Sequence, residues 1–168
     1  MKRGNKWRLI LAMLISLTAC SKQSGNEQSQ EVKAPIFSAA TLGEQQVLTV
    51  DEYLKAEAYA TASMMNGKRQ AQICRACHSF ELDGPNIIGP TLYGLFGRQA
   101  GEHGGFGYSP VLRDAGFVWT PRALDAWLAQ PGSFLPGNRM TFVGVLRKQD
   151  RDDLIAFLLM ETSDKEVE

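Results

Sequence analysis

The chain has 168 residues, with 18 Lys and Arg balanced by 18 Asp and Glu, and 44% of its residues are hydrophobic. From Asp51 onward, however, 12 Lys and Arg stand against 15 Asp and Glu, so the zero formal charge conceals a net charge of −3 in the C-terminal part. This balance excludes the basic surface that nucleic-acid binding requires. The sequence contains no internal repeat, and its length indicates one folded domain.

The N-terminal segment has the pattern of a secretory signal. Residues 1–8 carry four basic residues and no acidic one, and Leu9 to Leu17 is apolar apart from Ser16. Such a stretch is too short to span a bilayer. The ending Leu17-Thr18-Ala19-Cys20 resembles a bacterial lipobox, which predicts removal of a signal peptide of residues 1–19 and lipidation of Cys20. The alternative is an ordinary signal peptide cut nearby, which leaves Cys20 as a free thiol.

Residues 20–48 are rich in Ser, Gln, Glu, Lys and Gly and contain few large apolar residues. A chain of this composition cannot bury enough surface to fold by itself. We therefore predict a lipid-anchored flexible tether over residues 20–48 and one folded domain over residues 49–168. Because each buried methylene of an acyl chain contributes roughly 0.8 kcal/mol, several chains on Cys20 would hold the protein on a membrane, at the periplasmic face of a bacterial cell envelope.

The pattern along the folded part is helical throughout. Thr49-Val50-Asp51-Glu52 has the form of a capping box, and Asn66-Gly67 is expected to end or break the stretch that it opens. No segment alternates in the manner of a strand, so the fold class is all-α. The predicted helices cover residues 49–65, a segment leading into Cys74, residues 109–116, residues 120–130 and residues 150–161.

The motif Cys74-Arg75-Ala76-Cys77-His78 is C-x-x-C-H, which is typical of covalent haem attachment. A turn of helix between the cysteines lets both sulfurs reach one porphyrin edge, and the following imidazole is directed at the metal. The sequence thus predicts one haem c with thioether bonds to Cys74 and Cys77 and with His78 as an iron ligand. A thioredoxin-like redox pair and half of a zinc site are the alternatives. Two thioethers and one lipid anchor use all three cysteines, so no disulfide is expected.

A sixth iron ligand is expected from a rigid loop. Met140 ends Pro136-Gly137-Asn138-Arg139-Met140, where proline and glycine fix the backbone and a thioether can be presented to the iron. His103 lies in a glycine-rich loop, which predicts a surface histidine. The remaining methionines of the mature chain are at helical positions typical of core packing: Met64, Met65 and Met160. Two permanent ligands favour ferrous iron and exclude oxygen and peroxide, which indicates a carrier rather than a catalyst.

Several other segments follow a specific pattern: Gly89–Arg98, Tyr108-Ser109, Gly116–Trp119 and Arg151–Leu158. With the haem motif and the Pro-Gly-x-x-Met loop, they resemble a small class I cytochrome c of the mitochondrial and photosynthetic-bacterial type, over about residues 62–162. The resemblance implies that the class I fold wraps around one covalent haem. It also implies that the Pro90 carbonyl accepts a hydrogen bond from His78. Residues Arg98, Tyr108 and Trp119 are then expected to contact a buried propionate.

The sequence departs from that family at several positions. Gln70 and Ala71 stand where an aromatic residue usually packs on the last helix, which predicts a repacked helix crossing. Trp127 occupies a position where a tyrosine often bonds the methionine sulfur, and Asn138 replaces a common threonine. Ile73 takes one position of the lysine ring that surrounds the haem edge in relatives, so we expect apolar docking with little salt sensitivity.

The predicted function is a membrane-tethered, monomeric single-electron carrier. It would pass electrons from a quinol-oxidising complex to a terminal oxidase, a reductase or a photosynthetic reaction centre in a respiratory or photosynthetic chain. One alternative is a small haem enzyme, a peroxidase or nitric-oxide-handling protein, in which Met140 dissociates readily. The other is a haem sensor or a dedicated subunit of one complex.

Overall fold

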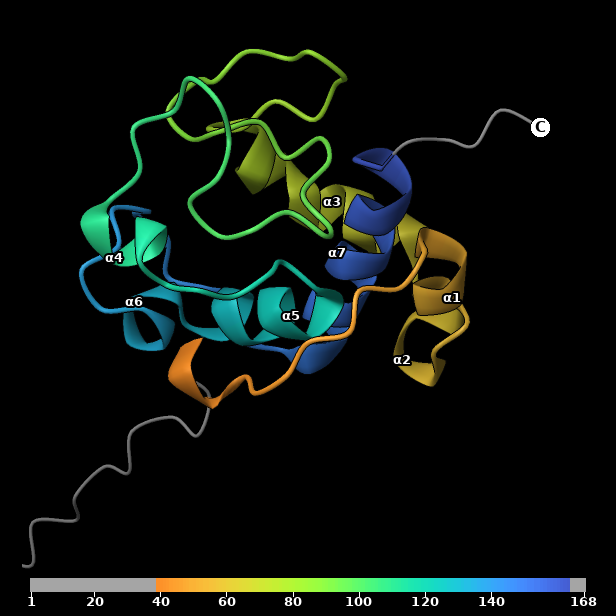
Figure 1. The fold of residues 1–168 in the computed structure, drawn as a ribbon. Helices are drawn as coiled ribbons and strands as arrows, with labels where there is room; N and C mark the ends of the chain where they lie inside the picture. The colour runs from red at the N-terminus through yellow and green to blue at the C-terminus, as the bar shows by residue number, and fades with distance from the viewer. Residues whose placement is uncertain (1–38, 164–168) are drawn as a thin grey trace, which may run out of the picture. The chain divides into compact units, whose positions relative to one another are not determined.

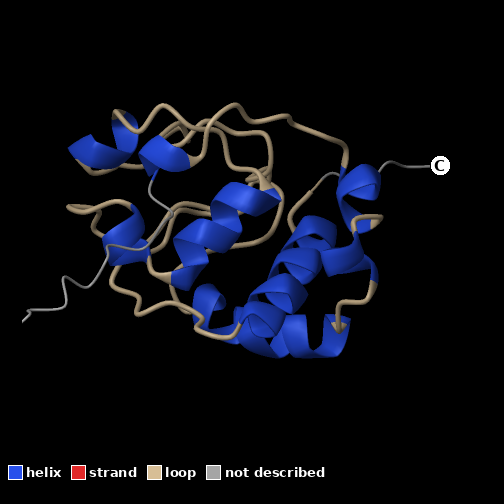
Figure 2. Cartoon of the chain, turned by 90° about the horizontal axis from the view of Figure 1, so that it is seen from below, coloured by secondary structure: helices blue, strands red, loops and turns tan. Residues whose placement is uncertain are grey.

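The computed structural model describes residues 39–163, which are helices joined by long loops (Figures 1 and 2). The chain divides into two units, Met1–Val32 and Lys33–Glu168, and the described residues lie in the second. No strand occurs within residues 39–163, so the predicted all-α class is confirmed. The elements in chain order are η1 (Ala39–Thr41), α1 (Val50–Leu54), α2 (Glu57–Ala60), α3 (Met64–Arg75), α4 (Pro110–Arg113), α5 (Pro121–Ala129), α6 (Pro131–Phe134) and α7 (Lys148–Glu161).

Three helices begin at the residues that sequence signals select: α1, α4 and α5. The capping box at the start of α1 is present, with Thr49 and Glu52 bonding each other's backbone N–H groups. The predicted helix over residues 49–65 is instead divided into α1, α2 and the first turn of α3. Ser63 caps α3, so Asn66-Gly67 lies inside this helix rather than at the end of one. The expectation of a break at Asn66-Gly67 was therefore wrong.

Helices α3 and α7 cross at very close range, and small residues permit this approach. A Cβ atom added at Gly67 would lie 2.1 Å from the Asp153 carbonyl oxygen and 2.7 Å from Phe157 Cβ. Ala71 is completely buried one turn further along. Helices α1 and α2 also contact α7. The crossing is thus packed with small side chains, and α1 and α2 of the additional N-terminal segment lie against other parts of α7, as α5 does.

Residues 42–48 are bound to the domain, although their composition assigned them to the tether. Leu42 is only 2% exposed and belongs to the core. The Gln45 side chain pairs with the backbone of Val118, donating to its carbonyl oxygen at 2.6 Å and accepting from its N–H at 2.8 Å. The buried Leu42 side chain and the two hydrogen bonds of the Gln45 amide hold residues 42–48 against the domain. The rest of the predicted tether, up to residue 38, lies outside the described residues.

A cluster of aromatic side chains forms the core beside α5 and α6. The Trp119 ring lies edge-on to Phe117 and Trp127, with centroid distances of 4.8 and 5.5 Å. Phe134 completes the cluster through an edge-on contact with Trp127 at 5.9 Å. Edge-to-face pairs of this kind contribute about 0.5–1.5 kcal/mol each beyond area burial. Met140 is half-buried and packs against the hydrophobic core to which this cluster belongs.

Candidate haem site

The two cysteines of the haem motif lie at the C-terminal end of α3. The backbone N–H groups of Cys77 and His78 both donate to the Cys74 carbonyl oxygen, at 3.0 and 2.9 Å, so one tight turn fixes the spacing of the two thiols. Both cysteine side chains are half-buried. Burial raises the pKa of Cys74 to about 11. A thioredoxin-like pair needs the opposite shift, because its reactive species is the thiolate.

The His78 ring is held from two sides by the segment Gly89-Pro90. Its Nδ1 lies 2.6 Å from the Pro90 carbonyl oxygen, so Nδ1–H donates and Nε2 is left with a free lone pair. Burial lowers the pKa of His78 below its ordinary value, against the raising effect of the Pro90 bond, which favours the neutral ring that binds metals. A Cβ atom at position 89 would lie 2.3 Å from His78 Cε1, so only glycine fits against the imidazole.

The predicted methionine loop is fixed by its own asparagine. Asn138 Oδ1 accepts a hydrogen bond from the Met140 N–H at 2.9 Å. Its Nδ2 donates to the carbonyl oxygens of Pro131 and Leu135, both at 2.9 Å. Gly137 has a φ of 87°, a left-handed conformation that favours glycine. No sequence pattern predicts this role of Asn138.

The predicted propionate-binding residues come together around Arg98. The Trp119 N–H donates to the Arg98 carbonyl oxygen at 2.9 Å, so their backbones are paired. Arg98 also lies close enough to Tyr108 to affect its phenol: burial raises the pKa of Tyr108, and the guanidinium charge opposes that rise. The Arg98 side chain donates to the Thr91 carbonyl oxygen at 3.0 Å. Arg98 is thus linked to Trp119 through the backbone and to Tyr108 through its charge.

Ser109, the second residue of the Tyr108-Ser109 segment, adds a further donor beside these residues. Its side chain is buried, and its hydroxyl is the one buried side-chain polar atom within residues 39–163 without a hydrogen-bond partner from the protein. A buried unpaired hydroxyl costs about 1–3 kcal/mol. A carboxylate acceptor supplied by a haem propionate would remove that cost. The unpaired hydroxyl and the glycine cradle of His78 therefore both fit a bound haem.

Several curated proteins are similar to this chain. The cytochrome c homolog of Rickettsia felis is 38% identical over 125 residues, which cover 74% of this chain and 69% of that protein. The cytochrome c homolog of Bradyrhizobium diazoefficiens is 42% identical over 99 residues, 58% of this chain and 54% of the relative. The cytochrome c of Trypanosoma brucei brucei is 48% identical over 75 residues, 45% of this chain and 81% of the relative.

The chain belongs to the cytochrome c family. It matches no family model. It is a class I c-type cytochrome that carries covalently bound haem c with iron, and it transfers electrons rather than acting as an enzyme. The bacterial homologs indicate a protein of the cell envelope, on its periplasmic side. None of the helices in residues 39–163 has the length and hydropathy that crossing a bilayer requires.

The structure also shows the surroundings of His103 and Trp127, which the sequence alone does not define. His103 is half-buried rather than a free surface residue, and its Nδ1 lies 3.1 Å from an Arg98 Nη1. No local pattern identifies this contact, because the glycines around His103 leave its direction open. Trp127 is buried within the aromatic cluster, between Trp119 and Phe134. It fills the core behind the methionine loop.

Proposed function

We propose that this cytochrome is a membrane-tethered single-electron carrier whose haem is attached to Cys74 and Cys77 and whose iron lies between His78 and Met140. When bound, the haem iron takes up and releases one electron. The observation that carries the proposal is the 2.6 Å contact between His78 Nδ1 and the Pro90 carbonyl oxygen. This bond fixes the tautomer and the orientation of the ring and directs Nε2 to the metal.

The loop that carries Met140 supports a carrier with a closed sixth position. Its backbone is held by three hydrogen bonds of Asn138, so the thioether is presented by a loop that is already ordered. A ligand that stays bound in both oxidation states requires little movement when an electron arrives. The soft sulfur ligand favours ferrous iron, so we expect a high reduction potential.

The donors around Arg98 are proposed to bind one haem propionate. Arg98 would supply the positive charge, while Tyr108, Ser109 and Trp119 would supply hydroxyl and indole donors. The unpaired Ser109 hydroxyl supports this assignment, since it needs an acceptor that the described residues do not provide. Burial of a carboxylate is costly unless such donors surround it.

Membrane attachment is proposed to occur through the lipidated Cys20. Residues 21–38 then connect the anchor to the docked segment, and 18 residues of flexible chain span roughly 25 Å. Such a connection raises the effective concentration of the carrier at its partners in the same membrane. We expect palmitate labelling and membrane retention of the full-length protein, and loss of both in Cys20→Ala. Labelling that persists in the variant would contradict the anchor.

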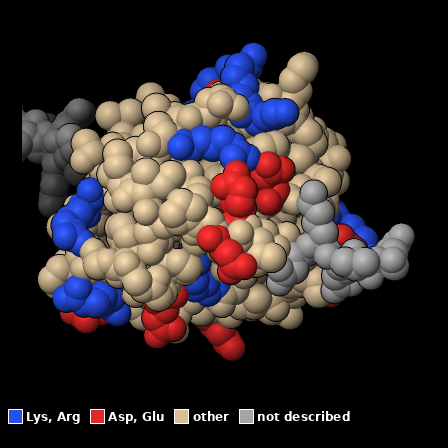
Figure 3. Space-filling model, turned by 90° about the horizontal axis from the view of Figure 1, so that it is seen from above, with Lys and Arg blue, Asp and Glu red and all other residues tan. Residues whose placement is uncertain are grey.

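The proposed partners are a quinol-oxidising complex as donor and a terminal oxidase, reductase or reaction centre as acceptor. Exposed apolar side chains occur near the haem motif and the methionine loop in the sequence: Ile73, Ile88 and Val143. On the face seen in Figure 3, basic and acidic side chains are interspersed around a broad uncharged area. Apolar docking predicts an electron-transfer rate that changes little with ionic strength. A steep decrease in that rate between low and moderate salt would contradict it.

A further inference from the structure

The contact between Arg98 and His103 defines the protonation state of the imidazole. A guanidinium has no acceptor, so at 3.1 Å the Arg98 Nη1–H donates and His103 Nδ1 accepts. His103 is therefore the neutral tautomer with its proton on Nε2. The same guanidinium donates to the carbonyl oxygens of Tyr93 at 3.3 Å and Thr91 at 3.0 Å. His103 thus shares in fixing the position of Arg98.

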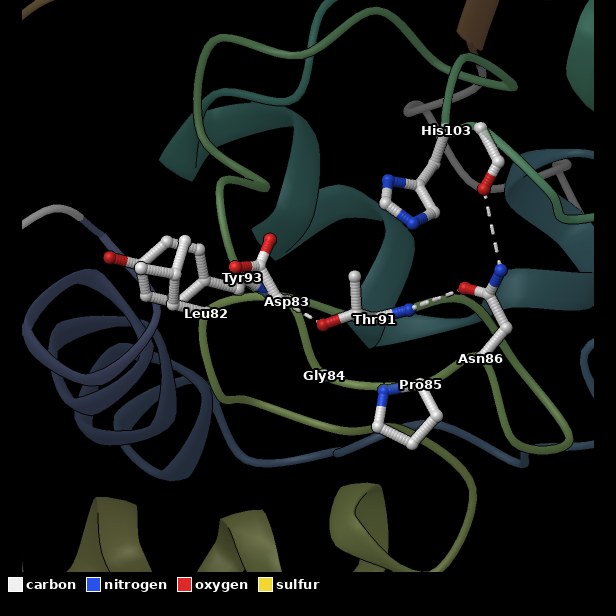
Figure 4. Close-up of a pocket in the computed structure, with 9 residues that line it drawn as sticks. Leu82, Asp83, Gly84, Pro85, Asn86, Thr91, Tyr93 and His103 are labelled. Atoms are coloured by element: carbon white, nitrogen blue, oxygen red, sulfur yellow. Dashed lines mark hydrogen bonds between the residues drawn. The ribbon is translucent and has the colours of Figure 1, made fainter.

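The ring of His103 is directed into an open pocket of about 430 Å³, where solvent protons reach it (Figure 4). On the pocket floor, Asn86 donates to the Gly104 carbonyl oxygen at 3.4 Å and accepts from the Thr91 N–H at 3.1 Å, which ties the His103 loop to the segment after His78. The titratable and charged groups around His103 are Arg98, Tyr108 beyond it, Asp83 and Tyr93 in the pocket, and the neighbouring Glu102.

We propose that His103 couples proton uptake to haem reduction by acting on Arg98, which makes it a positioning residue for the electron-transfer site. This inference rests on the proposed contact between Arg98 and a propionate. A proton on Nδ1 abolishes the bond from Arg98, because both ring nitrogens are then donors. It also places a second positive charge beside the guanidinium. Both changes arise at the group that is proposed to neutralise the propionate.

The direction of the coupling follows from charge. A positive charge near the haem disfavours ferric iron, so the reduction potential should rise as the pH falls through the titration of His103. Linkage is reciprocal, so the imidazole must bind protons more tightly in the ferrous protein. One electron from the donor is then accompanied by uptake of less than one proton from solvent at His103 Nδ1, and oxidation returns that proton. Burial and then the charge of Arg98 lower the pKa of His103, which places the coupling below neutral pH.

The small number of histidines allows the titration of His103 to be assigned without ambiguity. The sequence contains only two histidines, His78 and His103. With His78 on the iron, His103 is the one imidazole left to titrate. His103→Gln removes the titration but keeps a side-chain oxygen that accepts from Arg98. Glu102→Gln is the matched control, since it changes a neighbouring exposed charge without touching Arg98.

The experiment measures the reduction potential of the full-length holoprotein between about pH 4 and pH 8, a range that brackets the ordinary imidazole pKa. The NMR titration of the His103 ring is followed in both oxidation states. We expect proton affinity about sixfold to sixteenfold higher in the ferrous form, which is the effect of one charge on another across roughly 10–15 Å at the effective dielectric constant of about 20 near a protein surface. In the native protein this difference in proton affinity should make the reduction potential depend on pH. We expect this pH dependence to be lost in His103→Gln and kept in Glu102→Gln.

Two results would overturn the proposal: identical titration of His103 in both oxidation states, or the same potential profile in His103→Gln and the native protein. Arg98→Lys separates this failure from failure of the proposed propionate contact, because lysine keeps the charge but loses the planar fork. An altered potential in Arg98→Lys with an unaltered profile in His103→Gln rejects only the role of His103. An unaltered potential in Arg98→Lys rejects the contact on which the role depends.

Discussion

The side chain of Asn138 holds the backbone of Met140, with Oδ1 accepting from the Met140 N–H at 2.9 Å. The other end of the same amide donates to two carbonyl oxygens, those of Pro131 and Leu135. The hydrogen bonds of Asn138 thus join the two ends of the loop after α6 to each other, independently of any bound ligand. A threonine at this position, as is common in relatives, has one hydroxyl and cannot make all three bonds at once.

Replacing Asn138 should therefore weaken the hold on Met140. We expect Asn138→Ala to destabilise the protein by about 1–3 kcal/mol, because the half-buried Met140 N–H loses its acceptor and the carbonyl oxygens of Pro131 and Leu135 each lose one of two donors. The ferric variant should also bind added imidazole more tightly, since Met140 is displaced more easily. Asn138→Asp keeps the acceptor for the Met140 N–H, so its imidazole affinity should lie between those of the native protein and Asn138→Ala. Equal imidazole affinity in all three proteins would contradict this role of the asparagine.

Substitution at Gly89 should disrupt the position of His78. The methyl group of Gly89→Ala would lie 2.3 Å from His78 Cε1, so the ring must leave the Pro90 carbonyl or the loop must move. We expect a low yield of holoprotein and a perturbed spectrum of the iron. Gly104→Ala is the control, because a Cβ atom there meets no atom within 4 Å. If both variants load haem equally well, the cradle is not required.

Asp153 should make the stability depend on pH. Burial tends to raise the pKa of this carboxyl, but the hydrogen bonds from Asn66, Ser63 and Gln149 outweigh it and lower the pKa. Because the folded pKa lies below the unfolded one, the stabilisation is complete above the unfolded value, near 3.9, and is lost as the pH falls through the folded value.

Asp153→Asn should thus be less stable than the native protein at pH 7, by about 1–3 kcal/mol, and the difference should shrink in acid. Urea unfolding at a series of pH values measures this. A difference that is independent of pH would show that lost packing, rather than the carboxylate, is responsible.

The Arg151–Asp125 pair connects α7 to α5 and to the segment after Met140. Arg151 Nε lies 2.7 Å from the Asp125 carboxylate, and its Nη1 donates to the carbonyl oxygens of Val145 and Leu146. In this pair Arg151 is buried and Asp125 is partly exposed, so removing the guanidinium leaves polar groups without their donor, and we expect Arg151→Met to cost about 1–3 kcal/mol. Lys148→Met breaks a more exposed pair with Asp152 and should cost less than about 1 kcal/mol. Equal losses of thermal stability in Arg151→Met and Lys148→Met would contradict the larger contribution of the Arg151–Asp125 pair.

Local patterns were sufficient for much of the fold. The cap at Thr49 and the prolines that open α4 and α5 identify helix starts, because these signals depend on near neighbours. The spacing of C-x-x-C-H likewise predicts a haem from five consecutive residues. By contrast, the docking of Gln45 on Val118 joins residues 73 positions apart. No composition rule detects such a pairing.

The same distinction applies within the site. The contact between His103 and Arg98 depends on the path of a glycine-rich loop, and the unpaired Ser109 hydroxyl becomes visible only when the surrounding atoms are placed. In the sequence, Asn138 is only a departure from a common threonine. Its role appears once the carbonyl groups that receive its hydrogen bonds are known. Residue types predict the chemistry of the site, whereas tertiary contacts determine how it is tuned.

We propose that Met140 closes the sixth position of the iron. The most direct test of this proposal is the optical spectrum of the haem-loaded protein in both oxidation states, with and without carbon monoxide, for native protein and Met140→Ala. We expect a methionine-to-iron band in the native ferric protein that is lost in the variant, and rapid carbon monoxide binding to the reduced variant alone. Immediate carbon monoxide binding by the reduced native protein would show an open or labile sixth position and would contradict the account.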